Sequence, residues 1–332
     1  MKKFITTLLA LIIFAGTLSG CGTSADKSGE AGERKDFSLG VWSFSKVDPA
    51  DHYNGWATVR YGVGETLFKL NENLEVVPFL AKGYSLSEDK LTWTIHLRED
   101  VKFHNGKVMD GAAVKASLER LIKKNERAAE ELMIDSITAD GFSVAITTAK
   151  PNPTLINALS EPYSCIVDAS ADDGSVDFNM YPVGTGPYVM KKYVEDSHAY
   201  LEPFADYWGG TPASKSVTIK AFPDIDTMAL ALQNGEIDAA YGLSYDTLDQ
   251  FAGSDQFQVT QAETPRVYML YFNLQSGFMK DENLRRAVTM AVDKETYAKV
   301  LLNGAGTPTK AAFPSYLSYG DDSKMTDVPD FD

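Results

Sequence analysis

Residues 91–107 read LTWTIHLREDVKFHNGK and contain the clearest local signals in the chain. The first half of this stretch alternates between apolar and polar residues, with apolar side chains at Trp93, Ile95 and Leu97. An alternation of period two predicts a half-buried strand, with His96 on its wetter face. The second half ends in Asn105-Gly106, a pair typical of tight turns because both residues tolerate left-handed backbone conformations. We therefore expect a strand followed by a turn.

A helix and a further strand are predicted immediately after this stretch. Asp110 is a favoured helix N-cap. The residues behind it recur at helical spacing and define one apolar face, made of Val114, Leu118, Leu121 and Ile122. Phe142, Val144 and Ile146 then alternate as a second half-buried strand.

A β-α-β unit is predicted between residues 216 and 243. The segment SVTIKAF (216–222) has the character of a strand, and IDAAYGL (237–243) that of a following strand. Between them, Asp224 or Asp226 can cap a helix that stops at Gly235. Two strands joined in this way are expected to be parallel with a right-handed connection, which predicts the α/β class.

The last third of the chain shows similar signals. Residues 267–273 (VYMLYFN) are almost continuously apolar and predict a strand that is buried on both faces. Asp281 and Asp293 can each cap a helix, and the second helix is expected to end at Gly304. The first helix would turn four residues inward, namely Leu284, Ala287, Val288 and Ala291.

The N-terminus is typical of a targeting segment. Two lysines precede the apolar run 4–20, and the run leads through LSG into Cys21. LSGC resembles the bacterial lipobox, which implies that residues 1–20 are a signal peptide and that Cys21 becomes an acylated N-terminus. The alternative is a core cysteine within an ordinary signal. Residues 22–35 contain no aromatic or branched aliphatic residue, so we expect 21–35 to be a flexible tether.

Composition excludes several classes of function. The net charge of the 332 residues is −15. Without the two signal lysines it is −17, with 29 basic against 46 acidic residues, which argues against electrostatic binding of nucleic acid or anionic lipid. Cys165 is the only cysteine in the body of the chain, so no intramolecular disulfide can form there. It is most simply a small buried apolar residue. About 300 residues exceed what one core usually supports, so two domains are expected.

Six segments together resemble a known family. In chain order they are ETLFKLN (65–71), the opening stretch 91–107, VGTGPY (183–188), YWGG (207–210), NGEIDA (234–239) and LRRAVTMAVDK (284–294). Their order and spacing resemble the family 5 extracellular solute-binding proteins, the receptors of ABC importers for peptides, nickel and opine-type metallophores. The resemblance runs from about residue 37 to residue 319.

The resemblance implies an α/β, two-lobe periplasmic-binding-protein-like fold of type II (family 5, cluster C) that closes over its ligand without chemistry. It assigns residues 36–78 and 183–265 to a discontinuous lobe I core and residues 79–182 to an inserted subdomain. Residues 266–332 would begin a second lobe that is incomplete, because family members generally continue further. We expect the chain to be a fragment of a longer product. The missing part includes the acidic group that meets the peptide amine in peptide-binding relatives.

The loop VDPADHYNGWAT (47–58) is the first candidate for ligand contact. It places His52, Tyr53 and Trp56 in a polar, turn-rich context, where large rings have no periodic core to join. By the resemblance, His52 falls where nickel-binding relatives contribute a ligand-contacting tyrosine. The alternative is that Tyr53 and Trp56 begin the following helix and pack inward.

Further candidates are Tyr163, Trp42 and Tyr268. Nickel and metallophore relatives supply an arginine near the first of these, to meet the carboxylates of a chelate, but this sequence reads Glu161, Pro162 and Tyr163. The relatives' tryptophan in the preceding helix is replaced by alanine in NERAAEEL (125–132). These differences weaken the assignment of an anionic chelate and leave a peptide or another small solute open.

No enzyme or cofactor motif is found. VGTGPY lacks the lysine ending of a phosphate loop, and Pro187 removes a backbone donor; Gly184 and Gly186 more simply allow close backbone packing. The four histidines show no metal-ligand spacing and are expected at the surface or in caps. We therefore predict a monomeric, lipid-anchored, extracytoplasmic receptor that captures an oligopeptide or a nickel-type metal chelate and delivers it to an ABC permease, with no enzyme activity, cofactor or resident metal. A secreted hydrolase and a sensory or interaction lipoprotein are the alternatives.

Overall fold

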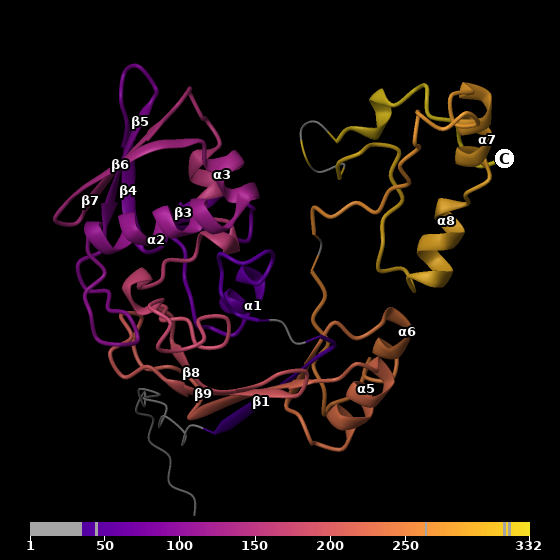
Figure 1. The fold of residues 1–332 in the computed structure, drawn as a ribbon. Coiled ribbons are helices and arrows are strands. Elements are labelled where there is room, and N and C mark those ends of the chain that lie inside the picture. The colour runs from indigo at the N-terminus through magenta and orange to yellow at the C-terminus, as the bar shows by residue number, and fades with distance from the viewer. Residues whose placement is uncertain (1–34, 44–45, 263, 315–316, 318–319) are drawn as a thin grey trace, which may run out of the picture. The chain divides into compact units, whose positions relative to one another are not determined.

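The computed structural model describes residues 35–332 except 44–45, 263, 315–316 and 318–319 (Figure 1). The predicted signal peptide and nearly all of the predicted tether, including Cys21, lie outside the described residues. No helix within the described part is both long and apolar enough to span a bilayer.

One sheet combines residues 36–41 with residues 188–241. Its strands in spatial order are β11 (Ala239–Tyr241), β1 (Asp36–Val41), β10 (Ser216–Ala221), β9 (His198–Pro203) and β8 (Tyr188–Val194). Strand β1 is parallel to both β10 and β11, while β9 is antiparallel to its two neighbours. The parallel orientation predicted for the β-α-β unit is confirmed, with β1 inserted between its two strands.

Helix α5 (Ile225–Gln233) connects these two strands. Its N-cap is Asp224, whose carboxylate accepts a hydrogen bond from the Thr227 N–H at 2.7 Å. Gly235 ends the helix region in a left-handed conformation with φ +73°. The predicted start and stop of this helix are therefore both confirmed.

A second, antiparallel sheet is built from residues 81–148. Its strand order is β4 (Ala81–Leu86), β5 (Thr92–Leu97), β7 (Ser143–Thr148) and β6 (Ile134–Asp140). The alternation predicted for β5 is confirmed, because Trp93, Ile95 and Leu97 are buried and His96 is exposed. In the turn that follows, Gly106 has a positive φ of 85° and Asn105 does not, so only the glycine uses the left-handed region.

Helices α2 (Gly111–Lys124) and α3 (Glu126–Leu132) follow this turn, and α2 packs against β6 and β7. The Asp110 carboxylate accepts a hydrogen bond from the Ala113 N–H at 2.9 Å, as expected for an N-cap. The predicted apolar face is confirmed: Val114, Leu118 and Leu121 belong to the main buried core. Shorter elements complete this part: α1 (Gly55–Arg60), β2 (Phe68–Leu70), β3 (Val76–Pro78), α4 (Leu155–Ala158), and the turns η1 (Pro162–Ser164) and η2 (Ala169–Ala171).

Three of the six family-like segments, 65–71, 183–188 and 207–210, meet at a buried carboxylate. Glu65 is 4% exposed and accepts hydrogen bonds from the Thr185 hydroxyl (2.9 Å), the Tyr207 hydroxyl (2.8 Å) and the Trp208 indole N–H (2.9 Å). Burial raises the pKa of Glu65 by more than these three donors lower it. Gly184 and Gly186 make the close approach possible, since a side chain at either would collide with the backbone of residues 62–64. Their predicted packing role is confirmed.

The predictions for Cys165 and His104 have different outcomes. Cys165 is buried as predicted, and burial raises the pKa of its thiol. The prediction of surface histidines is wrong for His104. Its Nε2 lies 2.9 Å from the Gly186 carbonyl oxygen, its ring packs edge-on against Phe204, and its Nδ1 is buried. Burial lowers the pKa of His104 to about 4.

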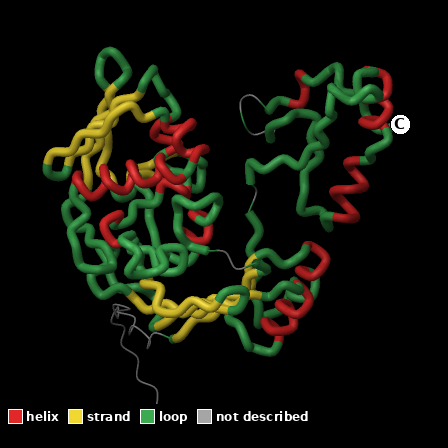
Figure 2. Tube along the Cα trace, viewed as in Figure 1, coloured by secondary structure: helices red, strands yellow, loops and turns green. Residues whose placement is uncertain are grey.

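The described part of residues 264–332 contains helices and loops but no strand (Figure 2). After α6 (Tyr245–Leu248), its elements are α7 (Glu282–Met290), α8 (Lys294–Thr296), the π-helical turn η3 (Tyr297–Leu301) and η4 (Asp322–Lys324). The predicted caps are confirmed, because Asp281 accepts from the Asn283 N–H and Asp293 from the Thr296 N–H.

The strand predicted at residues 267–273 is wrong. This segment is irregular, and Tyr268 and Tyr271 are 80% and 83% exposed. The inward face predicted for α7 is also wrong, since none of the residues of that helix is buried. A strand needs a hydrogen-bonded neighbour, and no described segment pairs with this one.

Candidate functional site

The loop between β1 and α1 is held by a buried ion pair. Asp48 has no exposed surface, and its carboxylate accepts hydrogen bonds from Arg120 (2.9 and 2.7 Å) and Lys124 (2.8 Å) on α2. It also accepts one from the Ala50 N–H at 3.1 Å. Burial alone would raise the pKa of Asp48, but the hydrogen bonds and charges of the two cations outweigh it and hold that pKa below its ordinary value.

An arginine lies against two tyrosine rings beside this loop. The Arg127 guanidinium carbon lies 5.8 Å from the Tyr53 ring centroid and 5.5 Å from that of Tyr163. Tyr53 also contacts Trp56, with 5.8 Å between the ring centroids. Both tyrosine distances are within reach of a cation–π contact. We call Tyr53, Trp56, Arg127, Glu131 and Tyr163 the Arg127 cluster.

Hydrogen bonds within the Arg127 cluster set its electrostatics. Arg127 Nε donates to a Glu131 carboxylate oxygen at 2.8 Å, and the Tyr163 hydroxyl donates to the other oxygen. Burial would raise the pKa of Glu131, but these two donors and the arginine charge keep it lowered. Burial and the neighbouring Glu131 carboxylate raise the pKa of Tyr163, so it remains a phenol and a donor.

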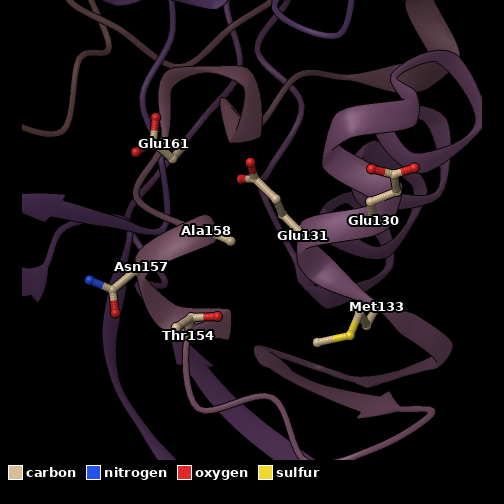
Figure 3. Close-up of a pocket in the computed structure, with 7 residues that line it drawn as sticks. All are labelled: Glu130, Glu131, Met133, Thr154, Asn157, Ala158 and Glu161. Atoms are coloured by element: carbon tan, nitrogen blue, oxygen red, sulfur yellow. The ribbon is translucent and has the colours of Figure 1, made fainter. Parts of the chain in front are cut away.

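An open pocket of about 430 Å³ adjoins the cluster (Figure 3). Its lining residues come from α3, the residue after α3, α4 and the segment before η1; they are Glu130, Glu131, Met133, Thr154, Asn157, Ala158 and Glu161. Glu161 is half-buried, and its pKa is raised by burial and by the charge of Glu131. The residues that line the pocket are therefore rich in carboxylates and include no cation, and Arg127 adjoins them through its ion pair with Glu131.

A second group of aromatic and basic residues lies where parallel strands end. Trp42 follows β1, and Tyr241 is the last residue of β11. The Arg60 guanidinium carbon lies 4.2 Å above the Tyr241 ring, and Gly242 adjoins Trp42. In α/β sheets the carboxyl ends of parallel strands are the usual edge for ligands. We call Trp42, Arg60, Tyr241 and Gly242 the strand-end group.

Helix α1 carries residues of both groups. Tyr53, Trp56 and Arg60 are spaced by three and four residues, so they share one side of this short helix and its preceding turn. The aromatic and cationic row therefore continues from Arg127 through α1 to Tyr241.

The structure brings together three of the six predicted ligand residues. Tyr53, Trp56 and Tyr163 belong to the Arg127 cluster, whereas Trp42 belongs to the strand-end group. Tyr268 is exposed and accepts a hydrogen bond from Arg266, which raises the pKa of that arginine.

The alternative of inward packing is confirmed for Trp56 and is wrong for Tyr53. Tyr53 is 67% exposed, whereas Trp56 packs partly against the main core. The His52 imidazole is largely exposed, and its Nδ1 lies 2.6 Å from an Asp51 carboxylate oxygen, while the His52 backbone carbonyl accepts a hydrogen bond from Asn125.

Sequence reasoning missed Arg127, Glu131 and Asn125. In NERAAEEL the family resemblance points to a missing tryptophan and gives no sign of a role for Arg127. The available signal was the Arg-Glu spacing of four residues, which is also typical of an ordinary surface helix pair. No group of three or more His, Cys, Asp or Glu side chains suited to a metal ion occurs in the described part of the chain.

The chain has the α/β fold of the type II periplasmic binding proteins. The solved nickel-binding protein NikA of Staphylococcus aureus, in complex with Ni(L-His)2, superposes with a TM-score of 0.78 and 28% identity. That alignment covers 86% of this chain and 60% of the NikA chain.

The chain belongs to the bacterial extracellular solute-binding proteins, family 5, whose middle-region model matches residues 75–332. The S. aureus nickel-binding protein NikA is 29% identical over 98% of this chain and 63% of its own length. The glutathione-binding protein GsiB of Salmonella paratyphi A is 29% identical over 86% of this chain and 57% of its own length. The chain thus spans about 60% of the length of these relatives.

Proposed function

We propose that this protein is the solute receptor of an ABC importer, which captures a small solute outside the cytoplasm and delivers it to a membrane permease. One observation carries the proposal: Arg127 lies against the Tyr53 and Tyr163 rings, beside an open pocket. Such an arrangement presents a cation and an exposed aromatic face to a solute. Membership of the solute-binding family supports the same conclusion.

The ligand we propose is amino-acid-derived and carries both an amino group and a carboxylate. The two relatives named above bind a nickel–histidine complex and glutathione, which share these groups. Arg127 suits a carboxylate, and Glu130 and Glu161 suit an ammonium group across the pocket. Because the described residues hold no metal-binding cluster, nickel would enter only as a preformed complex.

The mechanism we propose is closure of two lobes around the solute. Hinged closure is common among receptors of this kind, and the ligand shifts the equilibrium only by its differential affinity for the closed state. The receptor would act as a monomer, tethered through lipid on Cys21. Mass spectrometry of the mature N-terminus tests the tether: a diacylglyceryl Cys21 supports it, and an unmodified cysteine or cleavage elsewhere contradicts it.

Calorimetric titration with glutathione and with the nickel–histidine complex tests the binding role. Arg127→Ala should weaken binding by about tenfold to a hundredfold, the usual range for a hydrogen bond to a charged group. Arg98→Ala is a matched control, because Arg98 also stacks on a ring, that of Trp208 at 4.2 Å, and also pairs with a carboxylate, Asp100. The control should bind like the parent.

Equal losses in both variants, or no binding by the parent chain, would contradict the proposal. Recovery of glutathione after incubation distinguishes a receptor from a hydrolase, since a receptor returns its ligand unchanged.

A further inference from the structure

The loop that carries Tyr53 is anchored to the α2–α3 junction at two points. At its start, the buried Asp48 binds Arg120 and Lys124. Near its end, the His52 carbonyl accepts a hydrogen bond from Asn125 Nδ2 at 3.3 Å. Asp48 lies five residues before Tyr53, whereas His52 is its direct neighbour. The hydrogen bond from Asn125 is therefore the anchor that holds the backbone next to Tyr53.

Asn125 uses both ends of its amide. It stands between α2 and α3, and its Oδ1 accepts a hydrogen bond from the Ala128 N–H at 3.0 Å, which makes it the N-cap of α3. Its Nδ2 is the group that donates to His52. The side chain is buried, at 7% exposure for the residue, so neither bond is replaced easily by water.

The two residues joined by Asn125 adjoin the two halves of the cation–π contact. Tyr53 directly follows His52, and Arg127 lies in the first turn of α3, two residues after Asn125. Fixing the His52 carbonyl against the α3 cap therefore fixes the Tyr53 ring relative to the Arg127 guanidinium. Within the described residues, no other hydrogen bond joins residues 51–54 to α3.

His52 needs such support. Its φ is +49°, in the left-handed region that residues with a Cβ enter at a cost. Its imidazole is 85% exposed, and its Nδ1 lies 2.6 Å from the carboxylate of the adjacent Asp51, a contact that stays within the loop and does not join His52 to α3. A hydrogen bond to the carbonyl of the strained residue selects the conformation that directs the chain into Tyr53 and then into α1.

We propose that Asn125 is a positioning residue for ligand binding, which orders the Tyr53 loop against Arg127 before the ligand arrives. The inference rests on the proposed function, because it assigns ligand affinity to the Arg127 cluster. A loop that is already ordered loses less conformational entropy on binding, so preorganisation appears as tighter affinity.

The substitution Asn125→Asp removes the hydrogen bond to the His52 carbonyl and keeps the one from the Ala128 N–H. Aspartate is as good an N-cap as asparagine, so α3 should keep its cap. The carboxylate cannot donate to the His52 carbonyl and repels it, so the loop anchor is lost. Asp110→Asn is the matched control, because it makes the reverse exchange at the cap of α2, where no loop carbonyl is bound.

Amide hydrogen exchange, measured on the whole chain, reports directly how well ordered the loop is. The reporter amides are those of Asp51, Asn54 and Trp56, which donate within the loop to the carbonyls of Asp48, Asp51 and Tyr53. In Asn125→Asp their exchange should accelerate about fivefold or more, as expected when one neutral hydrogen bond is lost, while exchange across α3 stays unchanged. Asp110→Asn should leave the loop amides unchanged.

Titration with glutathione and with the nickel–histidine complex gives the second readout. Affinity should fall about fivefold in Asn125→Asp, measured well below the melting temperature of the variant, because a merely structural role would lower that melting temperature and leave the affinity unchanged. Unchanged loop exchange in Asn125→Asp would overturn the inference, and so would faster exchange with full affinity. If the parent chain binds neither probe, the proposed function fails with those ligands, and the exchange result alone decides whether Asn125 orders the loop.

Discussion

Two regions of this chain contain the same local signals and reach different states. In residues 47–182, α2 begins at the Asp110 cap and buries Leu118 to 1% exposure. In residues 264–332, α7 begins at the Asp281 cap in the same way, yet none of its residues is buried. Capping is satisfied by atoms two or three residues away, whereas burial requires partners from distant parts of the chain.

The strand predictions differ between the regions for the same reason. Strand β5 pairs with β4 on one side and β7 on the other, so its three apolar residues are enclosed. Residues 267–273 are more apolar, but they have no described neighbour to pair with and remain largely exposed. Hydrophobicity alone did not produce a strand. Matched substitutions in the two regions test this contrast.

The largest difference is expected between the fully buried Asp48 and the half-buried Asp322. Asp48→Ala leaves Arg120 and Lys124 without their buried partner and should lower the free energy of unfolding by about 3–5 kcal/mol. Asp322→Ala, which removes an acceptor for the Lys310 and Ala311 amides, should lower it by about 1 kcal/mol or less. Urea unfolding followed by tryptophan fluorescence measures both. Equal losses would mean that the two regions unfold as one unit.

A leucine pair tests the packing of the two helices. Leu118→Ala should lower the free energy of unfolding by about 3 kcal/mol, because it opens a cavity in the main core. Leu284→Ala on α7 should change it by less than about 0.5 kcal/mol, since little is packed around it. A loss above about 2 kcal/mol for Leu284→Ala would show that α7 packs in solution against residues it does not contact here.

The pH dependence of stability should come from the first region through His104. Its pKa falls from 6.5 to about 4 on folding, because burial disfavours the imidazolium. The unfolded chain then binds more protons, so the stabilisation is complete above pH 6.5 and is lost as the pH falls through 4, by up to about 3 kcal/mol. His104→Gln, which keeps a donor for the Gly186 carbonyl, should remove this loss. Urea unfolding at pH 7 and pH 4 compares the two chains, and an identical loss in both would contradict the assignment.

The smallest contrast concerns the caps. Asp110→Ala should lower the free energy of unfolding by about 1 kcal/mol, a typical value for an N-cap. Asp281→Ala should leave this free energy unchanged and reduce only the helical circular dichroism signal, because α7 is not part of the main core. A shift in the urea midpoint for Asp281→Ala would show that α7 unfolds together with the main core and would contradict this prediction.

The candidate site was predictable in part. Aromatic residues in a turn-rich loop indicated Tyr53 and Trp56, and both belong to the Arg127 cluster. Arg127 and Asn125 were not predictable, because one resembles an ordinary surface charge and the other an ordinary cap. Their roles arise from contacts with residues more than 70 positions earlier in the chain.

The sequence by itself determined the features that depend on near neighbours. These are the Asp110, Asp224, Asp281 and Asp293 caps, the alternation of β5, and the close-approach glycines of VGTGPY. The tertiary structure alone decided which apolar segments are buried and which polar residues meet, such as Asp48 with Arg120. The physical reason is range: a cap or a turn closes within a few residues, whereas a core or a binding face forms only when distant segments supply the opposite surface.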